Sequence, residues 1–127
     1  MPASSPKKTL IFILKFWLPV LVCMGIIFYA SSVPGSDIPS LFPFQDILFH
    51  FTIYMLLAVS FSRALKNTFL SLRLENIVIL AVFFGLFYGL TDETHQLFVA
   101  NRNFDSIDIF IDGLGSAIGS FIYPWLK

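Results

Sequence analysis

The chain has 127 residues, of which 57% are hydrophobic, 17% aromatic and only 13% charged. Soluble domains carry charge on about a quarter of their residues, so this composition excludes a disordered chain and an ordinary soluble domain. The 8 Lys and Arg residues balance the 8 Asp and Glu residues, which argues against a nucleic-acid-binding protein. A single cysteine, Cys23, excludes an intramolecular disulfide, and the length fits one domain over residues 1–127.

Four stretches are long and apolar enough to cross a hydrocarbon core about 30 Å thick, which takes roughly 20 helical residues each. In chain order they cover about residues 10–30, 46–65, 75–99 and 106–125. Backbone polar groups in lipid must hydrogen-bond within their own segment, so all four are predicted to be helices. The first is longer than the apolar core of a signal peptide and is expected to stay in the protein. The sequence therefore predicts an all-α integral membrane bundle of four transmembrane helices.

The positive charges lie almost entirely on one side of this arrangement. Arg102 is on the side opposite to Lys7, Lys8, Lys15, Arg63, Lys66, Arg73 and Lys127. Short loops rich in Lys and Arg stay in the cytoplasm, so both termini are predicted to be cytoplasmic. The acids have the reverse distribution, since only Glu75 is on the inner side. We therefore expect a multi-pass protein of the plasma membrane, with the lipid bilayer as its main partner.

Polar residues form a stripe on each of the last three predicted helices, starting at the acidic face. Residues three or four apart share one face of a helix. The stripes are Asp46, His50 and Tyr54 on the second helix, Asp92, Glu93, His95 and Gln96 on the third, and Asp105, Asp108 and Asp112 on the fourth. At 1.5 Å per residue, Asp112 is about 10 Å along its helix.

The acids farthest inside cannot face lipid. Each ionised residue at the centre of a membrane helix costs roughly 2.5 to 3.5 kcal/mol, so four of them would cost on the order of 10 kcal/mol as an upper bound. These four are Asp92, Glu93, Asp108 and Asp112. We expect them to face one another or water in an outward-open polar cleft between the last three helices. Arg102 is the only fixed cation on that side.

Several of these residues have simpler structural explanations. Asp46 and Asp105 are each placed to cap a helix, where an acid is favourable. His50 could form a helix–helix hydrogen bond, and Tyr54 could be ordinary packing. The inner acids lie too deep for caps, but structural ion pairing remains an alternative for them. The Gly115-Ser116-Ala117-Ile118-Gly119 element fits either a close contact within the bundle or a dimer seam.

Taken in order, these motifs resemble those of the VanZ-like family of small bacterial membrane proteins. The resemblance rests on Tyr29-Ala30-Ser31-Ser32-Val33-Pro34, Asp46-x-x-x-His50-x-x-x-Tyr54, Asp92-Glu93-x-His95-Gln96-x-Phe98, Arg102-x-x-Asp105-x-x-Asp108 and the glycines of the last helix. Ile47 stands where the family often has Lys, and Asp112 stands where Asn is common. The resemblance implies a place in the cell envelope and, at the level of the family, resistance to teicoplanin-type glycopeptide antibiotics.

Three functions are compatible with such a cleft. The first is an enzyme that acts on an envelope amphiphile, such as a lipid-linked precursor, at the outer leaflet, with a histidine as general acid or base. Its candidate catalytic residues are His50, Asp92, Glu93, His95 and Asp108, and its candidate substrate-binding residues are Asp46, Tyr54, Gln96, Arg102, Asp105 and Asp112. The second is a non-catalytic binder of a head group or glycopeptide. The third is a proton-relay or transport component, which would require a homo-oligomer.

No cofactor and no metal site is predicted. The sequence has no G-x-S-x-G, P-loop or H-E-x-x-H motif. Its 2 histidines and its carboxylates are suitable ligands for a divalent cation, but their spacing matches no recognised metal signature. The nucleophile of an enzyme would therefore be water or the substrate itself.

Overall fold

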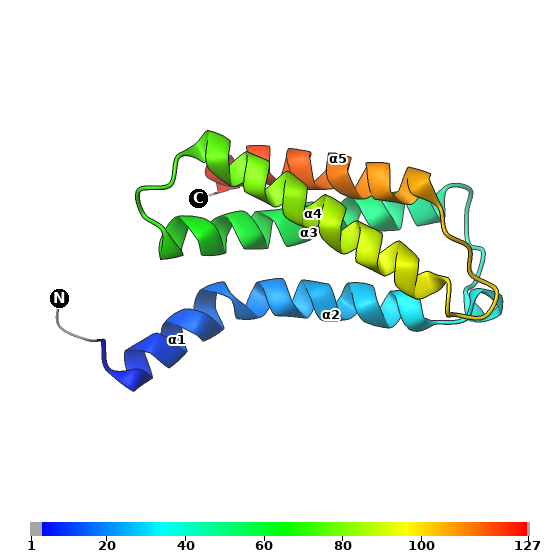
Figure 1. Ribbon diagram of the computed structural model, residues 1–127, viewed down its shortest axis with the longest axis horizontal. Helices are drawn as coiled ribbons and strands as arrows, with labels where there is room; N and C mark the ends of the chain where they lie inside the picture. The colour runs from blue at the N-terminus through cyan, green and yellow to red at the C-terminus, as the bar shows by residue number, and fades with distance from the viewer. Residues whose placement is uncertain (1–3, 127) are drawn as a thin grey trace.

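The computed structural model describes residues 4–126, and within this range all regular structure is helical. The elements are α1 (Pro6–Phe16), α2 (Leu18–Ser32), η1 (Gly35–Asp37), α3 (Gln45–Thr68), α4 (Leu74–Gln96), α5 (Ser106–Ile122) and η2 (Tyr123–Leu126), of which η1 and η2 are 3-10 helices. Figure 1 shows α3, α4 and α5 packed together, with α2 alongside α3 and α4 and with α1 bent away. The all-α prediction is confirmed.

Three helices, namely α3, α4 and α5 continued by η2, are each long and apolar enough to cross a membrane. A fourth span requires α1 and α2 together, and these two helices are bent by 45°. The sequence predicted one continuous helix over residues 10–30, whereas the structure has a break at Trp17. The described residues therefore form a multi-pass bundle with three spans, or four if the bent pair crosses as one.

Pro19 accounts for this break. Proline lacks an amide hydrogen and its ring clashes with the carbonyl four residues earlier, so it is tolerated only in the first turn of a helix. Pro19 occupies the first turn of α2. The carbonyl four residues before it, that of Lys15, accepts a hydrogen bond of 2.9 Å from Arg63 Nη1 on α3. A side chain of the bundle thus satisfies the backbone group that the proline leaves unpaired, as a membrane helix requires.

The other helices start within one residue of their predicted positions but end differently. α4 ends at Gln96 rather than Val99, because the next amides bond to carbonyls three residues back, and Asn101 then takes a left-handed conformation with φ of 59°. α5 ends at Ile122, and Pro124 lies in the tighter turn η2 that follows.

Glycines bring α5 into close contact with α3. A Cβ atom at Gly115 would lie 2.6 Å from the Phe51 carbonyl oxygen, and one at Gly119 would overlap the Met55 carbonyl oxygen. Small residues at this spacing allow two membrane helices to approach closely. Of the two explanations for the Gly115-x-x-x-Gly119 element, the close contact within the bundle is confirmed, because α3 covers this face of α5.

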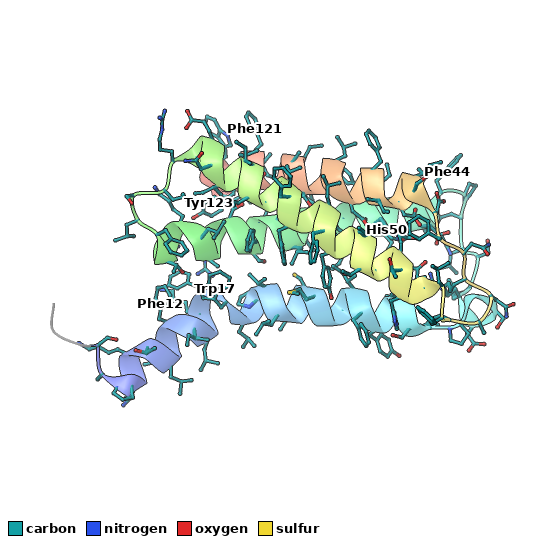
Figure 2. All side chains as sticks on the ribbon, in the orientation of Figure 1. Phe12, Trp17, Phe44, His50, Phe121 and Tyr123 are labelled. Carbon is teal, nitrogen blue, oxygen red and sulfur yellow. The ribbon has the colours of Figure 1, made fainter. Side chains whose placement is uncertain are left out.

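The outer faces of the bundle are apolar. Phe83, Phe87, Phe110 and Phe121 are between 64% and 69% exposed. Figure 2 shows such side chains, Phe121 among them, projecting away from the bundle. A soluble monomer rarely exposes apolar surface on this scale, whereas lipid would cover it. This surface supports a membrane location.

The two ends of the bundle carry opposite charges. The 33–44 and 97–105 connections lie together at one end, and the 69–73 connection lies at the other (Figure 1). All described acids except Glu75 lie in the half of the bundle next to the 33–44 and 97–105 connections, so we call this end the acidic end. We call the opposite end, with the 69–73 connection, the basic end. At the acidic end the two connections are joined by a 2.9 Å hydrogen bond from the Gly35 amide to the Ala100 carbonyl.

Candidate functional site

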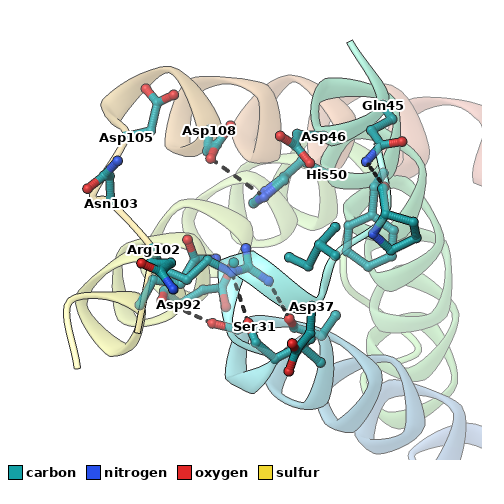
Figure 3. Close-up of a pocket in the computed structure, with 18 of the residues that line it drawn as sticks. Ser31, Asp37, Gln45, Asp46, His50, Asp92, Arg102, Asn103, Asp105 and Asp108 are labelled. Carbon is teal, nitrogen blue, oxygen red and sulfur yellow. Dashed lines mark hydrogen bonds and ion pairs between the residues drawn. The ribbon is translucent and has the colours of Figure 1, made fainter. Parts of the chain in front are cut away.

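A cavity of about 800 Å³ opens at the acidic end. Its walls come from the end of α2, the two connections and the adjoining ends of α3, α4 and α5 (Figure 3). Both apolar and polar side chains line it, and the apolar ones include Ile27, Leu41, Phe42 and Phe49. The predicted site residues that line it are Asp46, His50, Asp92, Gln96, Arg102, Asp105 and Asp108.

His50 and Asp112 form a buried polar contact beside this cavity. His50 Nδ1 lies 2.7 Å from Asp112 Oδ1, so the pair joins α3 to α5. Asp112 is fully buried and His50 is 7% exposed. When Asp112 is ionised it can only accept a hydrogen bond, so Nδ1 is then the donor and Nε2 is the nitrogen left for other partners. Figure 3 shows His50 directed toward Asp108, which also lines the cavity.

Asp108 lies on the Nε2 side of His50, and Glu93 lies near both residues. The distance from His50 Nε2 to Asp108 Oδ2 is 3.7 Å, too long for a hydrogen bond. Glu93 is fully buried on α4, and its Oε2 accepts a 2.9 Å hydrogen bond from the Asp105 amide. Its Oε1 has no hydrogen-bond partner among the described residues. Each of His50, Glu93 and Asp108 has an atom that could bind a metal ion, and these three atoms lie within 4.8 Å of one another.

Asp92 and Gln96 add two further polar side chains from α4. They are 7% and 4% exposed, and both line the cavity. The Ser31 hydroxyl donates a 3.4 Å hydrogen bond to the Asp92 carbonyl, which connects α4 to the end of α2. Asp92 also belongs to a second group with metal-ligand spacing, together with His50 and Asp112.

Tyr54 lies next to His50 but does not line the cavity. Its side chain is fully buried, and its ring is nearly parallel to the imidazole, with centroids 6.3 Å apart. Its hydroxyl has no hydrogen-bond partner among the described residues. In this conformation Tyr54, like Asp112, lies beside His50 and outside the lining of the cavity.

His95 lies outside this group of side chains. Its Nε2 is 3.0 Å from Ser32 Oγ, and its ring stacks on Phe28 with centroids 4.7 Å apart. Both partners belong to α2, and His95 does not line the cavity. The structure therefore brings the other candidate catalytic residues together and leaves His95 in a helix–helix contact.

Arg102 holds the 97–105 connection against the end of α2. Its Nε and Nη2 donate hydrogen bonds of 3.0 Å and 2.7 Å to the carbonyls of Val33 and Ala30. A cation is favourable at this position, because the last carbonyls of a helix carry partial negative charge. Arg102 makes no ion pair with any acid in residues 4–126. Arg102, the one fixed cation that the sequence predicts on this side, therefore does not offset the acids by a direct contact among the described residues.

Asp46 and Asp105 are both placed in the sequence to cap a helix, but only Asp105 does so. Asp105 Oδ1 accepts a 2.9 Å hydrogen bond from the Ile107 amide and caps α5, so the capping explanation is confirmed there. Asp46 does not cap α3, because the cap residue is Phe44, which has a φ of 62° and makes no side-chain cap bond. The capping explanation for Asp46 is wrong, and its exposed side chain lines the cavity.

Sequence reasoning missed the residue that makes room for Asp112. A Cβ atom at Gly89 on α4 would lie 2.5 Å from Asp112 Oδ2. The signal was present, since Gly85 and Gly89 repeat the four-residue spacing of Gly115 and Gly119. Close approach of α4 and α5 at these glycines is what allows a carboxylate to be buried between them.

A family model described as VanZ/LLP1 matches residues 16–127. The chain belongs to the VanZ-like family. The matched range includes α2 to α5, so every candidate residue of the acidic end lies within the VanZ-like region. Neither characterised proteins nor solved structures give a match.

Proposed function

We propose that this VanZ-like chain is an enzyme of the bacterial cell envelope that acts on the polar head group of a membrane amphiphile, such as a lipid-linked envelope precursor. The observation that carries the proposal is the buried hydrogen bond between His50 and Asp112 beside the cavity. Asp112 orients the imidazole and determines its tautomer, so Nε2 is available for chemistry on the cavity side. Asp92 and Asp108 line the same space and can bind or polarise a substrate group there.

The mixed lining of the cavity supports an amphiphilic substrate. Ile27, Leu41, Phe42 and Phe49 provide apolar contacts for the part of the molecule nearest the acyl chains. The carboxylates and the imidazole provide the few placed polar groups that fix orientation in a binding site. A substrate that enters from the bilayer would meet both kinds of surface at the end of the bundle.

The charge distribution supports an extracytoplasmic position for the cavity. Lys7, Lys8, Arg63, Lys66 and Arg73 lie toward the basic end, and such residues mark the cytoplasmic side. The acidic end then faces outward, where envelope amphiphiles and externally added glycopeptides are both accessible. A contribution to glycopeptide resistance would follow from action on such an amphiphile.

Cysteine labelling tests this orientation. In a Cys23→Ser background, Asn103→Cys places a thiol at the acidic end, and Leu70→Cys places one in the 69–73 connection, where Leu70 is 78% exposed. A membrane-impermeant maleimide should label Asn103→Cys in intact cells and Leu70→Cys only after permeabilisation. The reverse pattern would contradict an outward-facing cavity.

The enzymatic proposal is tested by turnover of envelope lipids by the protein in lipid vesicles. Asp112→Leu keeps a side chain of similar size but removes the oxygen that contacts His50 Nδ1, so we expect turnover to fall at least about tenfold. Glu75→Gln removes an exposed acid at the basic end and should leave turnover unchanged. Full turnover by Asp112→Leu would contradict the role of the pair.

A non-catalytic binder is the second candidate, and the charge of the lining favours it. The acids Asp37, Asp46, Asp92, Asp105 and Asp108 line the cavity, against Arg102 alone. Such a surface attracts a cationic head group or an amine of a glycopeptide. Protection against the drug without turnover of any envelope lipid, lost when Asp92 is changed to Asn, would establish binding in place of catalysis.

A further inference from the structure

We propose that the acidic end binds one divalent metal ion, with His50 Nε2 and the carboxylates of Glu93 and Asp108 as its protein ligands. The site is the one used in the proposed function, and with an ion bound His50 would act through the metal, as its ligand, and not by exchanging a proton itself. The test measures metal binding alone, so the two proposals can fail separately. The three residues come from α3, α4 and α5, and one ligand atom from each lies within 4.8 Å of the others. Because each helix contributes one ligand, no linear metal motif appears in the sequence.

The surroundings of His50 are those of a metal-binding imidazole. Metal-binding histidines almost always donate their other ring N–H to a carboxylate or a carbonyl. His50 Nδ1 makes this contact with the buried Asp112 at 2.7 Å. Two atoms bound to one ion at about 2.1 Å each are at most about 4.2 Å apart, and the 3.7 Å from Nε2 to Asp108 Oδ2 falls within that limit.

Glu93 gives the independent observation that points to a ligand. It is fully buried, and its Oε1 has no hydrogen-bond donor in the described part of the chain, where the carboxyl group of Asp108 is close to that of Glu93. An ionised carboxylate in this position is costly unless it is paired with a cation. The nearby Asp108 carboxylate adds repulsion, which a positive ion between the two groups would convert into attraction.

The ligand set and its position indicate the kind of ion and its use. One imidazole and two carboxylates suit Zn²⁺ or Mn²⁺, whereas thiolate and thioether ligands would select softer ions. His50 and Asp108 line the cavity, so the remaining coordination positions would face it. A bound dication would also change the sign of the local field, so that phosphate oxygens of a head group bind where carboxylates alone would repel them.

Metal titration of the intact protein tests the proposal. The protein, without a polyhistidine tag, is placed in nanodiscs of zwitterionic lipid, stripped with a chelator and titrated with Mn²⁺, and free Mn²⁺ is followed by electron paramagnetic resonance. We expect one saturable site per chain. Glu93→Gln and Asp112→Leu should each weaken binding by about 10- to 100-fold, whereas Glu75→Gln, which changes an exposed acid at the basic end, should not. Absence of a saturable site, or wild-type affinity in Glu93→Gln, would overturn the proposal.

Pulsed resonance of bound Mn²⁺ identifies the nitrogen ligand. The chain has only 2 histidines, so the coupling to a directly bound imidazole nitrogen has two candidate sources. We expect the coupling to disappear in His50→Gln and to persist in His95→Gln. Persistence in His50→Gln, or loss in His95→Gln, would overturn the assignment. If His50→Gln does not insert, the affinity of Glu93→Gln decides the outcome.

Discussion

The two ends of the bundle hold their charges in opposite ways. At the basic end, Arg73 and Glu75 form an ion pair of 3.0 Å whose side chains are 75% and 66% exposed. At the acidic end, His50 is 7% exposed, and Asp112 and Glu93 are fully buried. The Arg73–Glu75 pair at the basic end is solvated, whereas these three groups of the acidic end are enclosed by helices.

This difference separates charges that orient the protein from charges that serve a site. An exposed ion pair contributes about 0–1 kcal/mol, and its position relative to the membrane matters more than its partner. A buried pair carries a desolvation penalty that often makes apolar replacements equally stable. The enclosed charges of the acidic end are therefore poorly explained by stability alone, and the proposed function accounts for them.

The largest effect on stability is expected from breaking the buried pair. His50→Ala leaves the Asp112 carboxylate without its 2.7 Å partner, and removing one member of a buried pair costs about 3–5 kcal/mol. Denaturant unfolding in mild detergent, followed by circular dichroism, would measure this loss. A loss no greater than that caused by Arg73→Ala would remove the difference between the two ends.

A smaller effect is expected from filling the space beside Asp112. A Cβ atom in Gly89→Ala would lie 2.5 Å from Asp112 Oδ2, and overpacking of this kind costs about 1–3 kcal/mol. Gly25→Ala is the matched control, because nothing lies within 4 Å of its added Cβ. The same unfolding assay should separate the two variants, and equal stability would contradict the close α4–α5 contact.

Arg102→Gln should loosen the rim of the cavity and leave the rest of the bundle intact. The variant loses the hydrogen bonds to the Val33 and Ala30 carbonyls, and bonds from a charged donor contribute about 1.5–3 kcal/mol each at most. Hydrogen exchange of the Gly35 amide, which bonds to the Ala100 carbonyl, should become faster. Lys66→Gln, at the other end, should leave that exchange rate unchanged.

The smallest effect is expected at the basic end itself. Arg73→Ala breaks the exposed ion pair with Glu75 and should change stability by about 1 kcal/mol or less, with a smaller difference at high salt. Unfolding measured at low and high ionic strength checks both statements. A loss comparable to that of His50→Ala would show that the exposed pair is structural.

Helix positions were predictable because apolar length and helical spacing are local properties of the sequence. The starts of α3, α4 and α5 were predicted within one residue. The break at Trp17 was missed because the apolar run continues through Pro19, although proline has a clear steric effect in a helix.

Membership of the site was harder to predict than its place in the chain. Helical spacing put Asp46, His50 and Tyr54 on one face, but exposure separates them: Asp46 lies at the rim and Tyr54 is fully buried. His95 and Asp112 depend on contacts between helices, with α2 for the first and with α3 for the second. Pairing between helices depends on their rotation and close approach, which the periodicity of one segment does not contain.

A paired substitution of the two histidines tests the central claim most directly. Each variant, His50→Gln and His95→Gln, is checked for membrane insertion and then assayed for envelope-lipid turnover and for glycopeptide susceptibility of the cells. We expect His50→Gln to reduce turnover at least about 100-fold and to abolish protection, and His95→Gln to retain both. Full activity in His50→Gln, or an equal loss in His95→Gln, would contradict a functional site centred on His50 at the acidic end.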